Sequence, residues 1–142
     1  QEESLCRILE TVDDKTKKTK SVVHIYEEKG VLYGKIVKLF RKASEETCPK
    51  CTKCKEALKN KPTCGLRMLW GLKKSTDIYY KGGKILDPKN GKIYTVKIWF
   101  EKKNTGKILK VRGYILFFYR TQTWFRVPKP TQKTCAQLCK KK

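Results

Sequence analysis

The sequence predicts an all-β fold: a roughly eight-stranded antiparallel up-and-down barrel with a long Cys-rich loop and a short C-terminal tail. The first observation is that residues 84–127 contain three alternating apolar runs rich in β-branched and aromatic side chains. The second is that turn signals containing glycine separate these runs. The third is an earlier hairpin of the same kind at 21–40. Closing such a meander removes the exposed edges of an open sheet.

The turn signals divide the chain into short strands around one long irregular insertion. Lys29-Gly30 ends the first clear strand, Gly82-Gly83 is read as a turn, and Gly34 suggests a bulge inside a strand. Pro128 ends the sheet because proline cannot donate to a ladder. The expected strands are 5–12 (alternatively a short helical lead-in), 21–26, 31–40, 66–72, 77–80, 84–86, 93–100, 108–118 and 121–127.

A chain of 142 residues is expected to form a single domain with its own core. We place the barrel at about 5–127, the Cys-rich loop at 43–64 and a basic tail at 128–142. No apolar run approaches the ~20 residues of a membrane-spanning helix, so no membrane span is expected. The start, Gln1-Glu2-Glu3, suits a mature exported protein whose signal peptide has been removed, or a shortened chain.

The formal net charge is +22, with 35 Lys and Arg against 13 Asp and Glu. This charge favours anionic partners such as acidic glycans, lipid headgroups or nucleic acid. The simpler interpretation is a solvated surface, because lysine greatly outnumbers the arginine that forks onto phosphates. The lysines that would contribute to an anionic surface contact are Lys15, Lys17, Lys18, Lys20, Lys102, Lys103 and Lys140, Lys141 and Lys142.

Seven cysteines are many for this length, and an odd number leaves one over. The CxxC repeat at 48–54 is compatible with zinc or with thiol–disulfide exchange at Cys51 and Cys54. Neither a second CxxC at finger-like spacing nor a βαβ context accompanies it, so structural disulfides are preferred and no metal is predicted. The disulfide candidates are Cys6, Cys48, Cys51, Cys54, Cys64, Cys135 and Cys139, with their pairing open.

Catalytic signatures are weak. His24 is the single histidine, lies mid-strand, and is interpreted as a residue of the barrel wall. Asp13-Asp14 is a carboxylate pair in a lysine-rich turn, which is typical of a solvated loop. No nucleophile motif of the GxSxG kind occurs. We therefore predict that the protein is not an enzyme and needs no cofactor.

The strands after residue 92 carry apolar residues on both faces. Tyr94, Val96, Ile98 and Phe100 share one face, and the positions of Arg120, Gln122, Trp124 and Arg126 are in phase. An eight-stranded barrel is either filled by side chains or holds one small ligand. The residues predicted to line a ligand cavity are Tyr33, Ile36, Val96, Ile98 and Trp124, with Arg112 as a polar anchor.

An ordered set of motifs covers most of the chain from Val12 to Val127. The motifs are DDKT (13–16), SVVHIY (21–26), LYGKIVKL (32–39), LWGL (69–72), GGKILDP (82–88), GKIY (91–94), LKVRGY (109–114) and RTQTW (120–124). Together they resemble a family of small exported proteins of Gram-negative bacteria, known as a domain of unknown function.

The resemblance implies a lipocalin-like (calycin) barrel, a secreted or periplasmic location, and no established reaction. The chain departs from the family pattern in the first strand, where Arg7 and Leu9 stand in place of a Gly and a Trp. That departure removes the ring on which a late arginine such as Arg120 would stack to plug the barrel.

We therefore expect a non-enzymatic exported binding protein that carries a small apolar or amphipathic molecule in the barrel. The alternative is a basic interaction protein that binds acidic glycans, lipid headgroups or nucleic acid through its surface. The oligomeric state does not follow from these residues.

Overall fold

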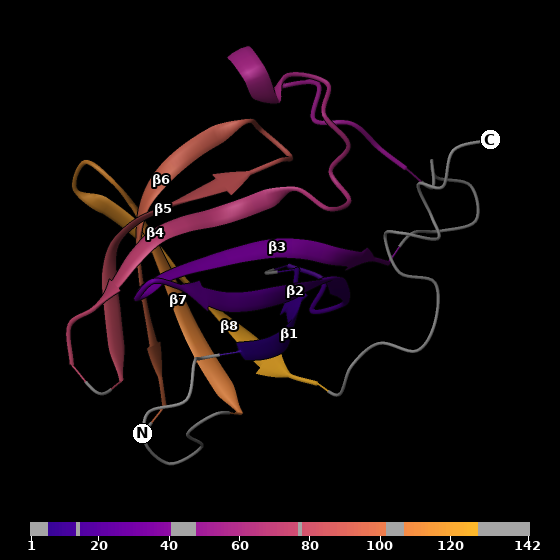
Figure 1. Cartoon of the computed structure of the whole chain (residues 1–142). Helices are drawn as coiled ribbons and strands as arrows, with labels where there is room; N and C mark the ends of the chain where they lie inside the picture. Colours follow the sequence, from indigo (N-terminus) through magenta and orange to yellow (C-terminus); the bar gives the residue numbers. More distant parts are fainter. Residues whose placement is uncertain (1–5, 14, 41–47, 77, 102–106, 128–142) are drawn as a thin grey trace.

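Alternating side chains and tight turns fold the chain into eight antiparallel strands that close in sequence order into one barrel (Figure 1). The structure, a computed structural model, describes residues 6–13, 15–40, 48–76, 78–101 and 107–127. The strands are β1 (Cys6–Val12), β2 (Thr19–Glu28), β3 (Val31–Leu39), β4 (Arg67–Lys74), β5 (Tyr79–Asp87), β6 (Lys92–Phe100), β7 (Ile108–Ile115) and β8 (Phe118–Arg126).

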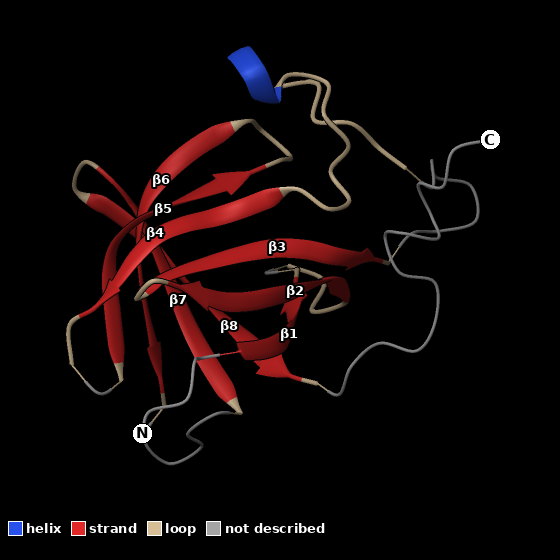
Figure 2. Cartoon of the chain, in the orientation of Figure 1, coloured by secondary structure: helices blue, strands red, loops and turns tan. Residues whose placement is uncertain are grey.

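The predicted all-β barrel is confirmed. One 3-10 helix, η1 (Glu56–Leu58), lies in the Cys-rich loop, and the rest of the described chain is strand, turn or loop (Figure 2). None of the helical segments in this described part has the length and apolarity that a bilayer-spanning helix needs.

Two predicted strand boundaries were wrong, for different reasons. β5 is a single strand that runs through Gly82-Gly83, where the register with β6 shifts between Tyr80 and Gly83. Gly83 is required because a Cβ there would lie 2.6 Å from the carbonyl oxygen of Trp70 on β4. The predicted strand 108–118 turns back instead at Leu116, and Ile115 pairs with Phe118 across a two-residue turn.

Other turns match the sequence signals. Lys29 and Gly30 both have positive φ between β2 and β3, as a type I′ hairpin requires. The predicted irregularity at Gly34 is present, because the β3–β4 register shifts on both sides of it. The turn expected at 104–106 and the tail 128–142 lie outside the described residues.

The core forms where the inward positions of all strands meet. Leu9, Val23, Leu69, Ile98 and Leu109 are completely buried there. Thr11 and Ser21 are the buried polar pair of the β1–β2 wall, and their hydroxyl oxygens lie 2.6 Å apart. The hydrogen bond offsets the loss of hydration of two buried hydroxyls.

The barrel closes over a short seam. β1 and β8 pair only at Leu9↔Arg126 and Glu10↔Phe125 in the described chain. Continuing this antiparallel register would place Val12, the last residue of β1, opposite Thr123. The first half of β8, from Phe118 onwards, therefore extends past the end of β1 and forms part of the barrel rim.

The Cys-rich loop packs against the turn between β5 and β6. Cys51 Sγ, which belongs to a disulfide with Cys54, lies 3.6 Å from the carbonyl oxygen of Pro88. Gly91 has φ +75°, and a Cβ there would overlap the carbonyl oxygen of Lys53. Both observations explain why the loop and the turn fit closely, and why glycine follows Asn90.

Candidate functional site: the open end of the barrel

Inward-facing residues become more exposed toward one end of the barrel. Along β8, Trp124 is 1% exposed, Gln122 is half-buried and Arg120 is exposed. Their partners on β7 follow the same order, from buried Leu109 and Val111 to half-buried Gly113. The inward side chains of these two strands are therefore buried near Trp124 and exposed near Arg120; we call the end near Trp124 the sealed end.

The neighbouring strands β5 and β6 show the same trend. Val96 and Ile98 are buried, whereas Tyr94, the next inward position on β6, is half-buried beside Ile85 of β5. A Cβ at Gly113 would lie 3.5 Å from Tyr94 Cβ and 3.8 Å from Ile85 Cγ2. These three residues therefore converge on the inner side of the wall, and glycine at 113 leaves space between them.

We call this region the open end. Its residues are Ile85, Tyr94, Gly113, Arg120 and Gln122. Tyr94 adds a polar group at the rim, because Asn90 Nδ2 donates to its hydroxyl at 3.4 Å. Trp124 lies beneath, and its indole N–H donates to Gln122 Oε1 at 3.1 Å. The open end thus combines an apolar floor with a few polar groups, which is the usual composition of a small-molecule site.

The predicted lining residues separate into two groups. Ile36, Val96, Ile98 and Trp124 are buried in the core, at inward positions of their strands. Whether they contact a ligand stays a prediction. Val96 and Ile98 of β6 and Trp124 of β8 belong to the same buried apolar cluster, which lies below the open end.

Tyr33 lies on the outer face, so its predicted place in the lining was wrong. Leu32 and Gly34 on either side of it are the buried, inward positions of β3. The Tyr33 ring stacks on Tyr26 at 5.8 Å, and the guanidinium of Arg67 lies 4.3 Å from its centroid. Its apolar ring is thus covered on the outside of the barrel.

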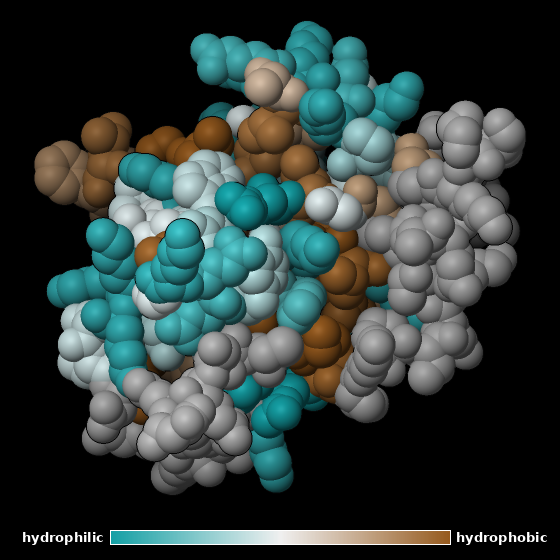
Figure 3. All heavy atoms as spheres, viewed as in Figure 1, coloured by the Kyte–Doolittle hydropathy of each residue, from teal (hydrophilic) through white to brown (hydrophobic). Residues whose placement is uncertain are grey.

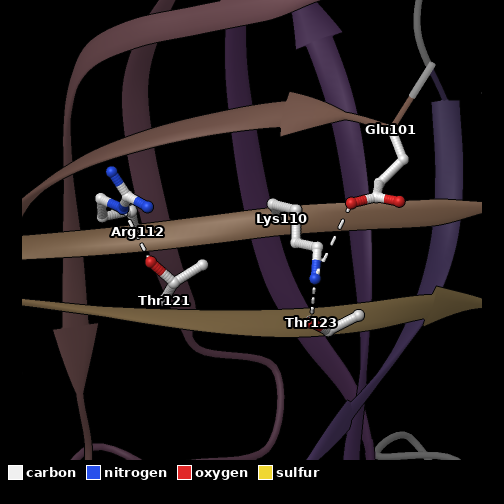
Figure 4. A network of polar contacts seen from close by, with 5 residues as sticks. All are labelled: Glu101, Lys110, Arg112, Thr121 and Thr123. Carbon is white, nitrogen blue, oxygen red and sulfur yellow. Dashed lines mark hydrogen bonds and ion pairs between the residues drawn. The ribbon is translucent and has the colours of Figure 1, made fainter.

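Arg112 is also on the outer face and cannot anchor a ligand in the interior. Its Nε donates to Thr121 Oγ1 at 2.7 Å (Figure 4). Its guanidinium lies 4.4 Å from the ring centroid of Tyr119. Lys110 on the same face donates to Thr123 Oγ1 at 2.8 Å. Buried Val111 between them points inward, as strand alternation requires.

The sequence reasoning missed the open-end residues as a group. The sequence does show which strand face these residues share. Tyr94 is on the same face as Val96 and Ile98, and Arg120 and Gln122 are on the same face as Trp124. The missing information was burial, because alternation gives the face of a residue and not its depth along the barrel axis.

The first strand contributes an arginine to the sealed end. This residue is Arg7, and its guanidinium lies 5.8 Å from the centroid of the Phe100 ring. The departure from the family pattern at Arg7 and Leu9 leaves a late arginine such as Arg120 without a ring of the first strand on which to stack. In this chain Arg120 lies at the open end, and an arginine of the first strand covers an aromatic ring of β6.

The cysteines of the loop are structural. Cys51 and Cys54 form a disulfide, which confirms the preference for disulfide bonding at this pair. Both residues are at most 2% exposed, so the sulfur atoms lack the access that thiol–disulfide exchange needs. Cys48 and Cys64 are disulfide-bonded as well. Cys135, Cys139 and the side chain of Cys6 lie outside the described part of the chain.

The two candidate acid–base groups have structural surroundings. His24 is half-buried on the outer face, 5.4 Å from the Tyr26 ring, and burial together with nearby Lys35 lowers its pKa. Asp13 Oδ1 accepts backbone N–H bonds from Lys15 and Thr16, both at 2.8 Å, and these lower the pKa of the carboxyl. Asp13 thus organises the β1–β2 turn, and Asp14 lies outside the described residues.

Residues 10–126 match the family described as "Uncharacterized protein conserved in bacteria (DUF2147)", and the chain belongs to this family. A solved structure from Helicobacter pylori, protein HP1028, is similar over 88% of this chain and 84% of its own. The TM-score is 0.72 at 25% sequence identity, and that protein is described as belonging to the lipocalin family. A search of curated proteins returned no match. The fold is therefore a lipocalin-like barrel, as the sequence predicted.

Proposed function

We propose that this protein is a non-enzymatic exported binding protein that carries a small apolar or amphipathic molecule, taken up through the open end. The observation that carries the proposal is the rise in exposure of inward residues from Trp124 to Arg120, above a floor of buried apolar side chains. Such a gradient gives a ligand a route into an apolar interior without opening the sealed end.

The chemistry of the open end suggests how the ligand would be held. An apolar portion would lie against Ile85, Val96 and the floor around Trp124, where contact with water is lost. A polar portion would remain at the rim, near the Tyr94 hydroxyl and the Arg120 guanidinium. The cationic group there favours an acidic head group over a basic one.

The test uses Gly113, whose missing side chain leaves room inside the wall. Gly113→Leu should fill the space between Tyr94 and Ile85 and weaken binding of the neutral apolar probe N-phenylnaphthylamine by about tenfold or more. Thr95→Leu adds a similar side chain on the exposed outer face of β6 and serves as the matched control.

Equal probe binding by wild type and Gly113→Leu, with thermal unfolding unchanged, would count against an interior site at this end. Native mass spectrometry of protein purified from its own source would then identify any molecule that the barrel retains.

A further inference from the structure

The turn between β7 and β8 exposes an uninterrupted run of large apolar side chains. Ile115, Leu116, Phe117, Phe118 and Tyr119 are 45%, 87%, 95%, 73% and 61% exposed. We call residues Ile115–Tyr119 the hairpin tip. Brown atoms project at the left of the molecule in Figure 3, where Figure 1 places this turn. A contiguous apolar projection of this kind marks an interaction site.

The backbone of the tip supports a specific role for these side chains. Leu116 has φ +55°, in the left-handed region that favours glycine or asparagine at a hairpin turn. Leucine costs about 1–2 kcal/mol there because its Cβ approaches the following carbonyl. Neither turn stability nor solubility accounts for Leu116 and Phe117 at these positions, whereas an apolar partner at the tip does.

Behind the tip, the outer face carries alternating aromatic rings and cations. Tyr119, the last residue of the tip, and its cross-strand neighbour Tyr114 have their ring centroids 5.8 Å apart. Arg112 then bridges Tyr119 and Trp99, with its guanidinium 4.4 Å and 5.1 Å from the two ring centroids. Lys97 extends the series, with its ammonium 5.5 Å from Trp99. Arg120, beside Tyr119, is exposed.

This order of side chains matches the cross-section of a bilayer surface. Leucine and phenylalanine at the extremity suit the acyl region, while tyrosine and tryptophan favour the headgroup boundary. Arginine and lysine behind them suit lipid phosphates. A second copy of this chain is a poorer partner, because two chains of formal net charge +22 repel each other.

We propose that the hairpin tip docks the protein onto bilayers that contain anionic phospholipid. Leu116, Phe117 and Phe118 enter the boundary between headgroups and acyl chains, and Arg112 and Arg120 contact the phosphates. This inference goes beyond the proposed function, since docking would occur whether or not the barrel holds a molecule. It also brings the open end, which contains Arg120, to the lipid surface.

The test is vesicle co-sedimentation with the double variant Leu116→Gly, Phe117→Ser. Glycine is free to adopt the positive φ, so the turn should persist and thermal unfolding should not occur earlier. With vesicles of phosphatidylethanolamine and phosphatidylglycerol, the partition coefficient should fall about a hundredfold, since each apolar side chain contributes about tenfold. The net charge is unchanged, so nonspecific attraction is the same in both proteins.

Phe125→Ser is the matched control, because Phe125 is 42% exposed on the same strand at its other end. It should bind vesicles like the wild type, and phosphatidylcholine vesicles should bind all three proteins weakly. Equal binding by the tip variant and the wild type would overturn the proposal in favour of charge alone. A wild-type dimer in sedimentation velocity that the tip variant dissociates, without a difference on vesicles, would overturn it in favour of self-association.

Discussion

The two ends of the barrel are built from the same alternation but differ in packing. At the sealed end, the inward residues Leu9, Leu109 and Trp124 are almost completely buried, and Arg7 covers Phe100. At the open end, the corresponding inward positions are half-buried or exposed, and the tip beyond them is apolar. β7 and β8 keep the same antiparallel register through both regions. Along this strand pair, the two ends therefore differ in their side chains and not in their backbone pairing.

The largest difference between the ends should appear when Trp124 is truncated. Trp124→Ala should lower the free energy of unfolding by about 3–5 kcal/mol, because a large buried ring leaves a cavity and Gln122 loses its indole donor. Phe125→Ala, at the next and 42% exposed position, should cost less than about 1 kcal/mol. Denaturant unfolding measures both values.

Similar costs for the two variants would mean that Trp124 is not the main packing element of the sealed end. If Trp124→Ala does not fold, Trp124→Phe provides a smaller truncation that keeps the ring in the core.

Alanine substitutions at two inward glycines, Gly34 and Gly113, test the difference between tight and loose packing with a smaller expected change in stability. A Cβ at Gly34 would lie 3.1 Å from Leu69 Cβ and 3.3 Å from Val23 Cγ1, so Gly34→Ala should destabilise by about 1–3 kcal/mol. A Cβ at Gly113 meets only ordinary contacts, the nearest at 3.5 Å. Gly113→Ala should therefore stabilise by about 0.5–1 kcal/mol, through loss of unfolded-state entropy.

Thermal and denaturant unfolding of both alanine variants give the comparison. Opposite signs are expected, and a loss of stability at Gly113 would show that the open end is as closely packed as the region around Gly34.

The smallest expected effect concerns His24 on the outer face, away from both ends. Its lowered pKa means that the folded chain binds its proton less readily than the unfolded chain, whose histidine has its ordinary pKa near 6.5. Stability attributable to His24 should therefore be complete above that value and decrease as the pH falls below it.

His24→Gln should flatten the dependence of unfolding free energy on pH between about 7.5 and 5, a range above most carboxyl titrations. Lys35→Gln should flatten it partly, because the Lys35 charge contributes to the lowering while burial contributes more. Identical pH profiles for wild type and His24→Gln would show that His24 does not cause the pH dependence of the unfolding free energy in this range.

By itself, the sequence determined the class of fold and most of its strands. Alternation, β-branched residues and glycine turns specify strands locally, and consecutive hairpins leave few ways to arrange them other than a closed meander. The CxxC spacing indicated disulfides, and Cys51–Cys54 forms one. These features depend on residues close together in the chain, so local patterns are sufficient to predict them.

Only the tertiary structure decided which face of the wall points inward and where the barrel opens. Tyr33 and Arg112 were misplaced because the outer face is also rich in aromatic rings, so a period of two does not distinguish the faces. The turn at Leu116 was missed because no glycine marks it, and the bulge at Gly82-Gly83 was read as a turn. Burial and register arise from contacts between strands far apart in sequence, and these contacts exist only once the barrel closes.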